Sequence, residues 1–588
     1  MATKSSQQDA FVQGLKKVYG FYTLGFLTFV VVLAALEQMG MIGPRLIGWV
    51  FMAATILLYA VIGIWSRTTD LAEYYVAGRR VPAIFNGMAT GADWMSAASF
   101  MGMAGSLYLE GYDGLAWVMG WTGGYVLVAV FLAPYLRKFG QFTIPDFLGE
   151  RYGGNMARII GVIAAITASF TYVVAQLFGV GLVTSKLLEL NFELGVFVGL
   201  AGVLVCSFLG GMRAVTWTQV AQYIILIIAY WVPVVWMSWR VTGNPIPQLA
   251  YGDVLRQIGE LEVKFGITKH HVSPFHVRDM WNFLALTFVM MAGTAALPHI
   301  LMRYYTTPNV REARLSVGYS LFFIFLLYFT APAYAAFAKL EVFKNVVGLG
   351  IDALPAWVQT WGKAGWVTIN DLNADKILQW NEISLNTNAI VVATPEIAGL
   401  PYVVTGLVMA GGLAAALSTA DGLLLTIANA LSHDLYYKII DPKASTIKRL
   451  VIARTILLFV AVIAAAIATQ AGKWGILAFV AYAFSIASGS FLPALVLGIF
   501  WKRATTVAAN LGMSIGFLVT MYYLFATAFI GTPAEQLSRR WFNTAGLSAG
   551  IFGIAAGFIV IILVSLVTKA PDQKTQDLIE SVRYPRLS

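Results

Sequence analysis

Long apolar segments recur along the whole chain and constrain its fold more than any other feature of the sequence. A helix that crosses a membrane needs about 20 predominantly apolar residues. Fourteen stretches meet that length, near residues 18–39, 46–66, 82–109, 114–135, 156–187, 191–211, 216–239, 280–302, 313–338, 399–434, 449–470, 474–500, 504–530 and 546–568. Several are long or interrupted by Gly and Pro, which predicts tilted or broken helices. The sequence therefore predicts an all-α polytopic membrane protein with about 14 transmembrane helices.

The composition supports this prediction. Charged residues make up only 12% of the chain, about half of their share in soluble domains, so the chain could not cover a water-exposed surface. The net charge is +10, but the cations sit in short loops, which indicates topology determinants and not a nucleic-acid site. Cys206 is the only cysteine, which excludes an intramolecular disulfide and makes it most simply a small buried residue.

The distribution of Lys and Arg predicts the orientation in the membrane. If the N-terminus is inside, the cation-rich loops, which include Arg79, Arg137, Arg303 and Lys502, all fall on the cytoplasmic side. We therefore expect a bacterial inner-membrane protein with both termini in the cytoplasm. The polar start of the chain, followed by two apolar segments, predicts that the first helix is retained and is not a cleaved signal. Two longer external segments remain, 240–279 and 339–398. The second has four Trp and is either a cap or gate, or a loop with short interfacial helices.

Two carboxylates fall inside predicted spanning segments, where charge is rare and usually functional. Asp93 lies about 16 Å into its helix, near the membrane midplane, and Asp421 lies near the middle of the tenth segment. Each predicts a polar cavity or a cation beside it. The alternative is that each carboxylate caps a broken helix or accepts a hydrogen bond from a nearby Ser or Thr.

The segments around these carboxylates have compositions that suit a cation site. Residues 87–99 are rich in Gly, Ala, Thr and Ser, which favours a helix that unwinds and frees carbonyl oxygens and amides for ligands. In the tenth segment, Ala415, Ser418 and Thr419 share one helical face. These oxygens could complete a sodium shell, although Ser and Thr also commonly bond back to their own helix.

The sequence resembles the sodium:solute symporter family over about residues 67–505, and its acetate-permease branch in particular. The resemblance rests on several motifs in order: Tyr75–Arg80, Asp93–Phe100, Thr143–Gly153, Gly210–Gln219, Leu297–Tyr304, Ser418–Thr419 and Ser432–Tyr436. It implies a core of five plus five helices in an inverted repeat, like that of the leucine transporter. The implied domains are 1–81 (tail and two pre-core helices), 82–240 (first repeat), 241–279 (external loop), 280–503 (second repeat, with the external insert 339–398) and 504–588 (two post-core helices and a cytoplasmic tail).

The resemblance also implies a sodium site between the first and eighth core helices. Carried over to this chain, its ligands are the carbonyl oxygens of Ala92, Met95 and Ala415 and the hydroxyls of Ser418 and Thr419. The chain departs from the family in places. Trp94 stands where proline-transporter relatives have Asp, Gln219 stands where many members have Asp, and Asp421 is outside the general pattern and suggests a further cation or proton site.

A substrate pocket is expected near the midplane between the broken helices. Its candidate substrate or coupling residues are Asp93, Trp94, Ser96, Ser99, Tyr172, Gln176, Thr287, Met291, Thr294, Asp421, Tyr482 and Ser485. Singly, each is more often a packing or interhelical residue. His299 is interpreted as a polar residue at a helix end. The external residues His270, His271 and His276 are interpreted as part of a solvated loop, because their spacing does not fit a zinc site.

These observations predict a secondary transporter that couples sodium to uptake of a small organic solute by alternating access. The resemblance makes acetate or another short monocarboxylate the first expectation, and a large symporter subunit that pairs with a small membrane protein is a further suggestion. The alternatives are a membrane sensor with a transporter fold, and a symporter with proton coupling or another substrate. An enzyme is not expected, since no cluster of His, Glu or Cys and no phosphate-binding loop stands out.

Overall fold

The computed structural model describes residues 2–363, 365–470 and 475–584, and it is mostly helical. Within those ranges, 12 helices are long and apolar enough to cross a membrane. They are Ala10–Gln38, Pro44–Trp65, Ala98–Phe139, Asn155–Leu188, Gly210–Thr242, Met280–Thr306, Val310–Asn345, Tyr402–Ile440, Thr446–Ala468, Ile476–Phe500, Thr506–Phe529 and Gly546–Val567. The side chain of Cys206 and the first residue of the predicted segment 474–500 lie outside the described part.

Two predicted segments account for the difference between the 14 predicted segments and the 12 helices that are long enough to cross a membrane. The third, 82–109, is broken into α4 (Ala83–Trp94), a π-type turn η2 (Ala98–Gly102) and α5 (Met103–Glu110), and each piece alone is shorter than a span. The sixth, 191–211, is the first part of α10 (Phe192–Thr242), where the apolar helix Phe192–Leu204 is also short. The exact count of fourteen is therefore not confirmed, although both regions are helical as predicted.

The other elements have the following bounds. The first half holds α1 (Ala2–Gln38), α2 (Pro44–Trp65), α3 (Leu71–Val76), η1 (Ala77–Arg79), η3 (Gly111–Gly114), α6 (Leu115–Leu127), η4 (Val128–Leu132), α7 (Ala133–Phe139), α8 (Ile144–Tyr152), α9 (Asn155–Leu188), α11 (Pro247–Lys264), α12 (Met280–Thr294), α13 (Pro298–Met302) and η5 (Arg303–Thr306). The second half holds α14 (Val310–Tyr328), α15 (Ala331–Asn345), η6 (Ile351–Ala353), α16 (Ala356–Lys363), β1 (Val367–Ile369), η7 (Trp380–Glu382), β2 (Ile383–Leu385), α17 (Ile390–Ile397), α18 (Tyr402–Asn429), η8 (Ala430–Ile440), α19 (Thr446–Ala468), α20 (Ile476–Phe500), α21 (Thr506–Leu524), η10 (Phe525–Phe529), α22 (Pro533–Ser538), η11 (Trp541–Asn543), η12 (Gly546–Ser548), α23 (Gly550–Val567) and α24 (Gln573–Arg583).

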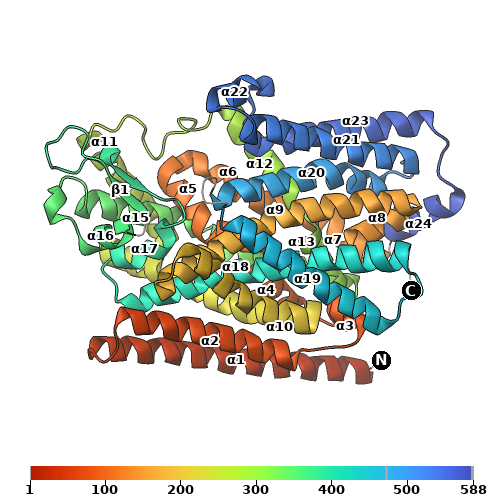
Figure 1. Ribbon diagram of the computed structural model, residues 1–588, viewed down its shortest axis with the longest axis horizontal. Coiled ribbons are helices and arrows are strands. Elements are labelled where there is room, and N and C mark those ends of the chain that lie inside the picture. The colour runs from red at the N-terminus through yellow and green to blue at the C-terminus, as the bar shows by residue number, and fades with distance from the viewer. Residues whose placement is uncertain (1, 364, 471–474, 585–588) are drawn as a thin grey trace.

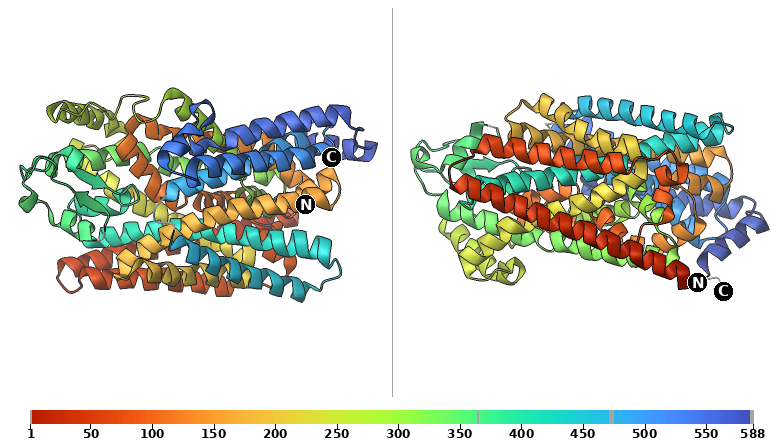
Figure 2. Two further views of the ribbon diagram at one scale, coloured as in Figure 1. Left: turned by 45° about the horizontal axis from the view of Figure 1, so that its top comes forward. Right: turned by 90° about the horizontal axis from the view of Figure 1, so that it is seen from below.

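The long helices lie roughly side by side, with the first and last pairs on opposite flanks (Figures 1 and 2). Helices α1 and α2 flank α10 and α18, while α21 and α23 pack against α20. Among the described helices α18 is the most buried, and its residues from Thr405 to Asn429 are all buried. Because it contacts α9, α10 and α4, α18 stands at the centre of the bundle.

One end of the molecule carries α11 and residues 339–398, and we call it the insert end (Figure 1). Here the insert folds into short helices and an antiparallel hairpin in which Val367 pairs with Leu385. Its Trp361 is fully buried. The carboxylate of Asp113 accepts hydrogen bonds from the backbone amides of Phe275 and Val277, both at 2.7 Å, which anchors the loop before α12. The insert therefore consists of short helices and a hairpin, next to a loop that Asp113 holds in place.

The opposite end carries α24 and the beginning of α1, and we call it the tail end (Figure 1). A buried cluster there joins α8, α9 and η8. Asp146 lies 3.0 Å from Arg158, 3.4 Å from His433 and 3.5 Å from Lys438. Burial alone would raise the pKa of Asp146, but the hydrogen bond from His433 and the surrounding cations lower it to about 2. Ligand atoms of Asp146, His433 and Asp434 lie within 4.8 Å of one another, yet the cationic neighbours already compensate the charge of Asp146, so we assign the cluster a structural role.

Candidate functional site

The first core helix is interrupted at the position that the sequence indicated. α4 ends at Trp94, Met95 has φ −76° and ψ 68°, and the amide of Ser96 turns back to the carbonyl of Trp94 at 2.8 Å. The small residues that precede the break allow neighbouring helices to approach closely. An added Cβ at Gly87, for example, would lie only 2.5 Å from Tyr319 Cβ of α14. Such a break removes intrahelical partners from the last carbonyls of α4.

Hydroxyls of α18 meet these carbonyls. Ser418 Oγ donates to the oxygens of Ala92 at 2.7 Å and Ala415 at 2.9 Å. Thr419 Oγ1 donates to the carbonyl of Asp93 at 2.7 Å and contacts that of Ala415 at 3.3 Å. Four of the five predicted cation ligands therefore lie together in contact. The fifth, Met95, lies at the break itself, one turn beyond the carbonyl of Gly91 that accepts its amide.

Asp93 and Arg303 form a fully buried ion pair beside this cluster. Arg303 Nε lies 2.8 Å from Asp93 Oδ2, and both side chains are 0% exposed. Arg303 Nη1 also donates to Thr216 Oγ1 of α10 at 3.1 Å. Gly422 of α18 allows the Asp93 carboxylate to lie close to α18, since a Cβ at position 422 would lie 2.3 Å from Asp93 Oδ1. From the sequence Arg303 was assigned to a cytoplasmic loop, and that placement is wrong, because the residue is inside the bundle.

Asp421 lies on the same helix but has a different partner. Ser207 Oγ of α10 donates a hydrogen bond to Asp421 Oδ1, and both side chains are buried. The interaction matches the alternative in which a nearby hydroxyl satisfies the carboxylate. The two intramembrane carboxylates thus have separate partners, a guanidinium for Asp93 and a serine for Asp421.

A ring of aromatic and polar side chains surrounds the break. The Trp94 ring lies 4.9 Å from that of Tyr125 and 5.6 Å from that of Phe484. Tyr172 of α9 packs edge-on against Phe484 at 5.9 Å. Ser99 shares a 2.7 Å hydrogen bond with Tyr328 of α14. These contacts bring three of the predicted substrate residues together, Trp94, Tyr172 and Ser99. Two more join them: Gln176 Oε1 accepts from the amide of Ala97 at 2.9 Å, and Ser96 Oγ lies 3.4 Å from the amide of Ser99.

His299 belongs to this ring, although the sequence suggested only a polar residue at a helix end. It opens α13, directly after a second break at residues 295–297, and its ring lies 5.6 Å from that of Tyr172. Both ring nitrogens are buried without a hydrogen-bond partner. The signal that could have found it is the Pro298-His299 pair inside an otherwise apolar segment, because Pro at a first helical position marks a helix start.

Several more polar groups near the break are buried and have no hydrogen-bond partner among the described residues. They include Gln176 Nε2, Trp121 Nε1, Trp94 Nε1, Tyr125 Oη, Arg303 Nη2 and, as an acceptor, Asp93 Oδ1. Buried polar atoms in folded proteins are nearly always hydrogen-bonded to protein or ordered water. A cluster of such atoms at one place therefore indicates a position where water or a polar ligand is held, and most of these groups are donors.

The remaining predicted residues lie elsewhere. Thr287 and Thr294 bond back to the carbonyls of Phe283 and Met290 in α12, and Met291 packs close to Gly123 of α6. These three residues therefore lie along the α12–α6 contact. The structure also does not bring Tyr482 and Ser485 to the break, because Tyr482 packs with Phe529 and Ser485 Oγ donates to the carbonyl of Leu547, both on the side of the last two spanning helices.

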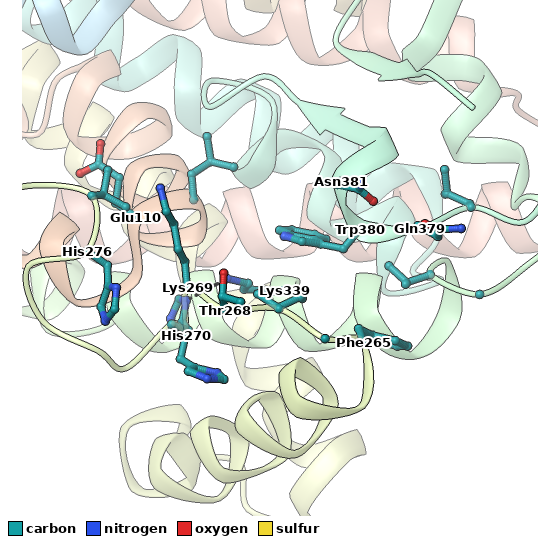
Figure 3. Close-up of a pocket in the computed structure, with 18 of the residues that line it drawn as sticks. Glu110, Phe265, Thr268, Lys269, His270, His276, Lys339, Gln379, Trp380 and Asn381 are labelled. Atoms are coloured by element: carbon teal, nitrogen blue, oxygen red, sulfur yellow. Dashed lines mark hydrogen bonds between the residues drawn. The ribbon is translucent and has the colours of Figure 1, made fainter. Parts of the chain in front are cut away.

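A cavity of about 750 Å³ opens at the insert end (Figure 3). Glu110 and His276 lie on one side of it, and Trp380 and Gln379 of the insert lie on the other. The expectation of a wholly solvated histidine loop is wrong for His271, which is only 5% exposed and lies 3.3 Å from Lys339 Nζ. Burial, together with the nearby Lys339, lowers the pKa of His271 to about 3, so the ring stays neutral.

Comparisons with known proteins identify the family. An uncharacterized symporter of Cupriavidus necator is 44% identical, with 95% of this chain and 97% of the relative covered. A solved structure of a Na⁺-coupled sialic acid symporter, in a substrate-bound outward-open state, has a TM-score of 0.67 at 16% identity and covers 90% of this chain and 99% of its own. At that identity the likeness concerns the fold. Residues 74–353 and 381–516 match the family model of the sodium:solute symporters. These relatives are transporters and not enzymes, and the chain belongs to the sodium:solute symporter family.

Proposed function

We propose that this protein is a sodium-coupled symporter of acetate or another short monocarboxylate. The observation that carries the proposal is the contact between the broken first core helix and two hydroxyls of α18. Membership of the sodium:solute symporter family supports sodium as the coupling ion. The aromatic side chains and buried hydrogen-bond donors around the break support a small solute that carries hydrogen-bond acceptors.

The sodium site of the proposal consists of hard oxygen ligands. Its members are the carbonyl oxygens of Ala92, Met95 and Ala415 and the hydroxyls of Ser418 and Thr419. The two hydroxyls donate to the carbonyls of Ala92 and Asp93. A cation would exchange these hydrogen bonds for ion–oxygen contacts and draw α4 and α18 together. Sodium would thereby favour the state in which the solute site is formed, which is the basis of coupling.

The solute site of the proposal lies between the two helix breaks. Gln176 Nε2, Trp121 Nε1 and Arg303 Nη2 can only donate, and all are buried without partners. A carboxylate presents only acceptors when ionised, so it complements such groups. The Trp94, Tyr172 and Phe484 rings leave little room between them, which favours a solute with a short carbon chain. Alternating access would then expose this site first to one side of the membrane and then to the other.

The direct test is uptake of labelled acetate into proteoliposomes, with and without an inward sodium gradient. We expect accumulation that requires sodium. Replacing both hydroxyls, Ser418→Ala with Thr419→Ala, should raise the half-saturating sodium concentration by about tenfold or more, since each tenfold change corresponds to only about 1.4 kcal/mol. The matched control is Ser490→Ala in α20, because Ser490 bonds to its own helix at Ile486.

Three results separate the parts of the proposal. Unchanged sodium dependence in the double variant would refute the assigned ion site. Sodium-dependent thermal protection without acetate uptake would leave sodium coupling standing and reject the monocarboxylate. Uptake that follows a proton gradient in the absence of sodium would replace sodium by protons as the coupling ion.

A further inference from the structure

A strongly basic pocket lies at the tail end, far along the chain from the residues of the candidate site. The end of α7, the start of α14 and the tail helix α24 form its walls, and its volume is about 1040 Å³. Five cationic side chains line it, Arg137, Lys138, Arg311, Arg314 and Arg583, and no acidic side chain is among its lining residues. A hollow with this charge and no internal counter-charge attracts an anion.

Two of the cationic side chains hold the walls of the pocket together through hydrogen bonds, and two others remain exposed to a ligand. Arg137 donates to the carbonyls of Thr307 and Pro308 at 2.8 and 2.7 Å, and Lys138 donates to backbone carbonyls of the tail helix. Arg311 and Arg314 are exposed, and no ion pair joins either of them to an acidic group in the described part of the chain.

The acidic residues near the basic pocket interact with groups outside its lining. The Glu312 carboxylate accepts the amide of Ala83 at 2.9 Å, Glu580 pairs with Lys502 at 2.6 Å, and Asp577 accepts from Gln573 at 2.7 Å. Within the described part of the chain, these three carboxylates therefore do not cancel the positive charge of the pocket.

An apolar groove continues from the basic pocket along α14. Its lining residues are Ile84, Arg314, Leu315, Gly318, Tyr319, Phe322 and Phe323, and its volume is about 710 Å³. Arg314 lines both hollows. The groove follows the outward side of a membrane-spanning helix, where Leu315 is 46% and Phe322 is 56% exposed. One arginine thus stands between a cationic pocket at the helix end and an apolar groove at membrane depth.

We propose that the pocket and the groove together bind one anionic phospholipid. The phosphate of the headgroup would lie among Arg311, Arg314 and Arg583, and an acyl chain would lie along α14 over Gly318. Basic pockets next to spanning helices bind anionic headgroups in this manner. Because α24 forms one wall through Ser581 and Tyr584, the bound lipid would also hold the tail helix against α7 and α14.

The charge is tested with the double variant Arg311→Gln plus Arg314→Gln. Purified full-length protein is titrated with phosphatidylglycerol or phosphatidylcholine in detergent, and bound lipid is counted by native mass spectrometry. We expect the variant to bind phosphatidylglycerol about 30-fold more weakly than wild type, with binding of phosphatidylcholine unchanged. Lys16→Gln plus Lys17→Gln, which removes two exposed cations from α1 at the tail end, should bind as wild type does. Equal affinity of wild type for both lipids, or equal loss in the control, would overturn the proposal.

The groove is tested without changing charge. A Cβ at Gly318 would meet no atom within 4 Å, so Gly318→Phe introduces a ring that starts from open space in the groove. We expect it to weaken phosphatidylglycerol binding by at least about tenfold, whereas Gly25→Phe, at an equally open position in α1, should have no effect. Inorganic phosphate serves as the soluble probe. Two results together would contradict the lipid proposal: inorganic phosphate raises the apparent Tm of wild type as much as the lipid does, and Gly318→Phe binds the lipid normally. The site would then bind a soluble anion.

Discussion

At the scale of single residues, the charge of Asp93 is the most consequential feature of the site. A carboxylate in the membrane interior is expensive unless it is paired. Its partner Arg303 is equally buried, so neither charge can reach water. The pair also lies next to the carbonyl of Asp93 that accepts from Thr419. The ion pair therefore fixes the position of the broken helix end at which the cation site is proposed.

We predict that removing either partner alone destabilises the protein more than removing both. Arg303→Gln or Asp93→Asn would leave an uncompensated buried charge, at a cost of about 3–5 kcal/mol. The double variant leaves two neutral groups that can still hydrogen-bond, so its loss should be smaller than that of either single variant and therefore well below their sum. The apparent Tm of each purified variant, followed by tryptophan fluorescence at fixed detergent, measures this. Strictly additive losses would contradict an energetic coupling between the two residues.

At the scale of elements, the helices of this bundle come close together through glycine. Gly489 of α20, Gly516 of α21 and Gly553 of α23 meet at one crossing, and a Cβ on Gly516 would lie 2.2 Å from the carbonyl oxygen of Gly489 and 3.0 Å from that of Gly553. Small residues at such crossings allow backbones to pack directly, which is the main source of helix association in membranes. The last two spanning helices are therefore joined to α20 by backbone contact.

Gly516→Ala is predicted to separate these helices. The added methyl meets backbone atoms that cannot rotate away, so we expect a loss of about 1–3 kcal/mol, typical of overpacking, and a lower apparent Tm. Gly25→Ala provides the comparison, because its Cβ would meet nothing within 4 Å and the substitution improves helix propensity. A Gly516→Ala protein as stable as the Gly25→Ala protein would mean that the helix crossing can accommodate an added methyl group.

The sequence predicted the helices better than it predicted which side chains contact one another. Apolar length gave the helices, and the Gly, Ala and Ser content of residues 87–99 indicated the break between Trp94 and Ala98. Ser418 and Thr419 were identified because helical spacing places them on one face. Arg303 and Tyr482 could not be placed in the same way. Burial of Arg303 depends on its pairing with a residue 210 positions away, and the direction of Tyr482 depends on which neighbour packs on α20.

At the scale of the whole molecule, the two ends differ in a way that bears on orientation. The insert end carries the folded insert and a cavity that the insert helps to line, and the tail end carries both α24 and the basic pocket. The described chain begins and ends at the tail end (Figure 1), which requires an even number of membrane crossings. The distribution of Lys and Arg predicts that the tail end faces the cytoplasm. An anionic phospholipid at the tail end would then come from the cytoplasmic leaflet, where basic side chains meet anionic headgroups.

Single introduced thiols test this orientation. Replacing Cys206 by Ser removes the only native cysteine, after which Gln359→Cys in α16 marks the insert end and Lys443→Cys marks the tail end, both at exposed positions. A membrane-impermeant maleimide added to intact spheroplasts should label Gln359→Cys, and should label Lys443→Cys only after permeabilisation. Cys206→Ser alone, which should remain unlabelled in both conditions, is the control. The reverse pattern would place the insert in the cytoplasm, and would mean that the loop cations of this chain do not set its topology. The proposed lipid would then have to come from the external leaflet.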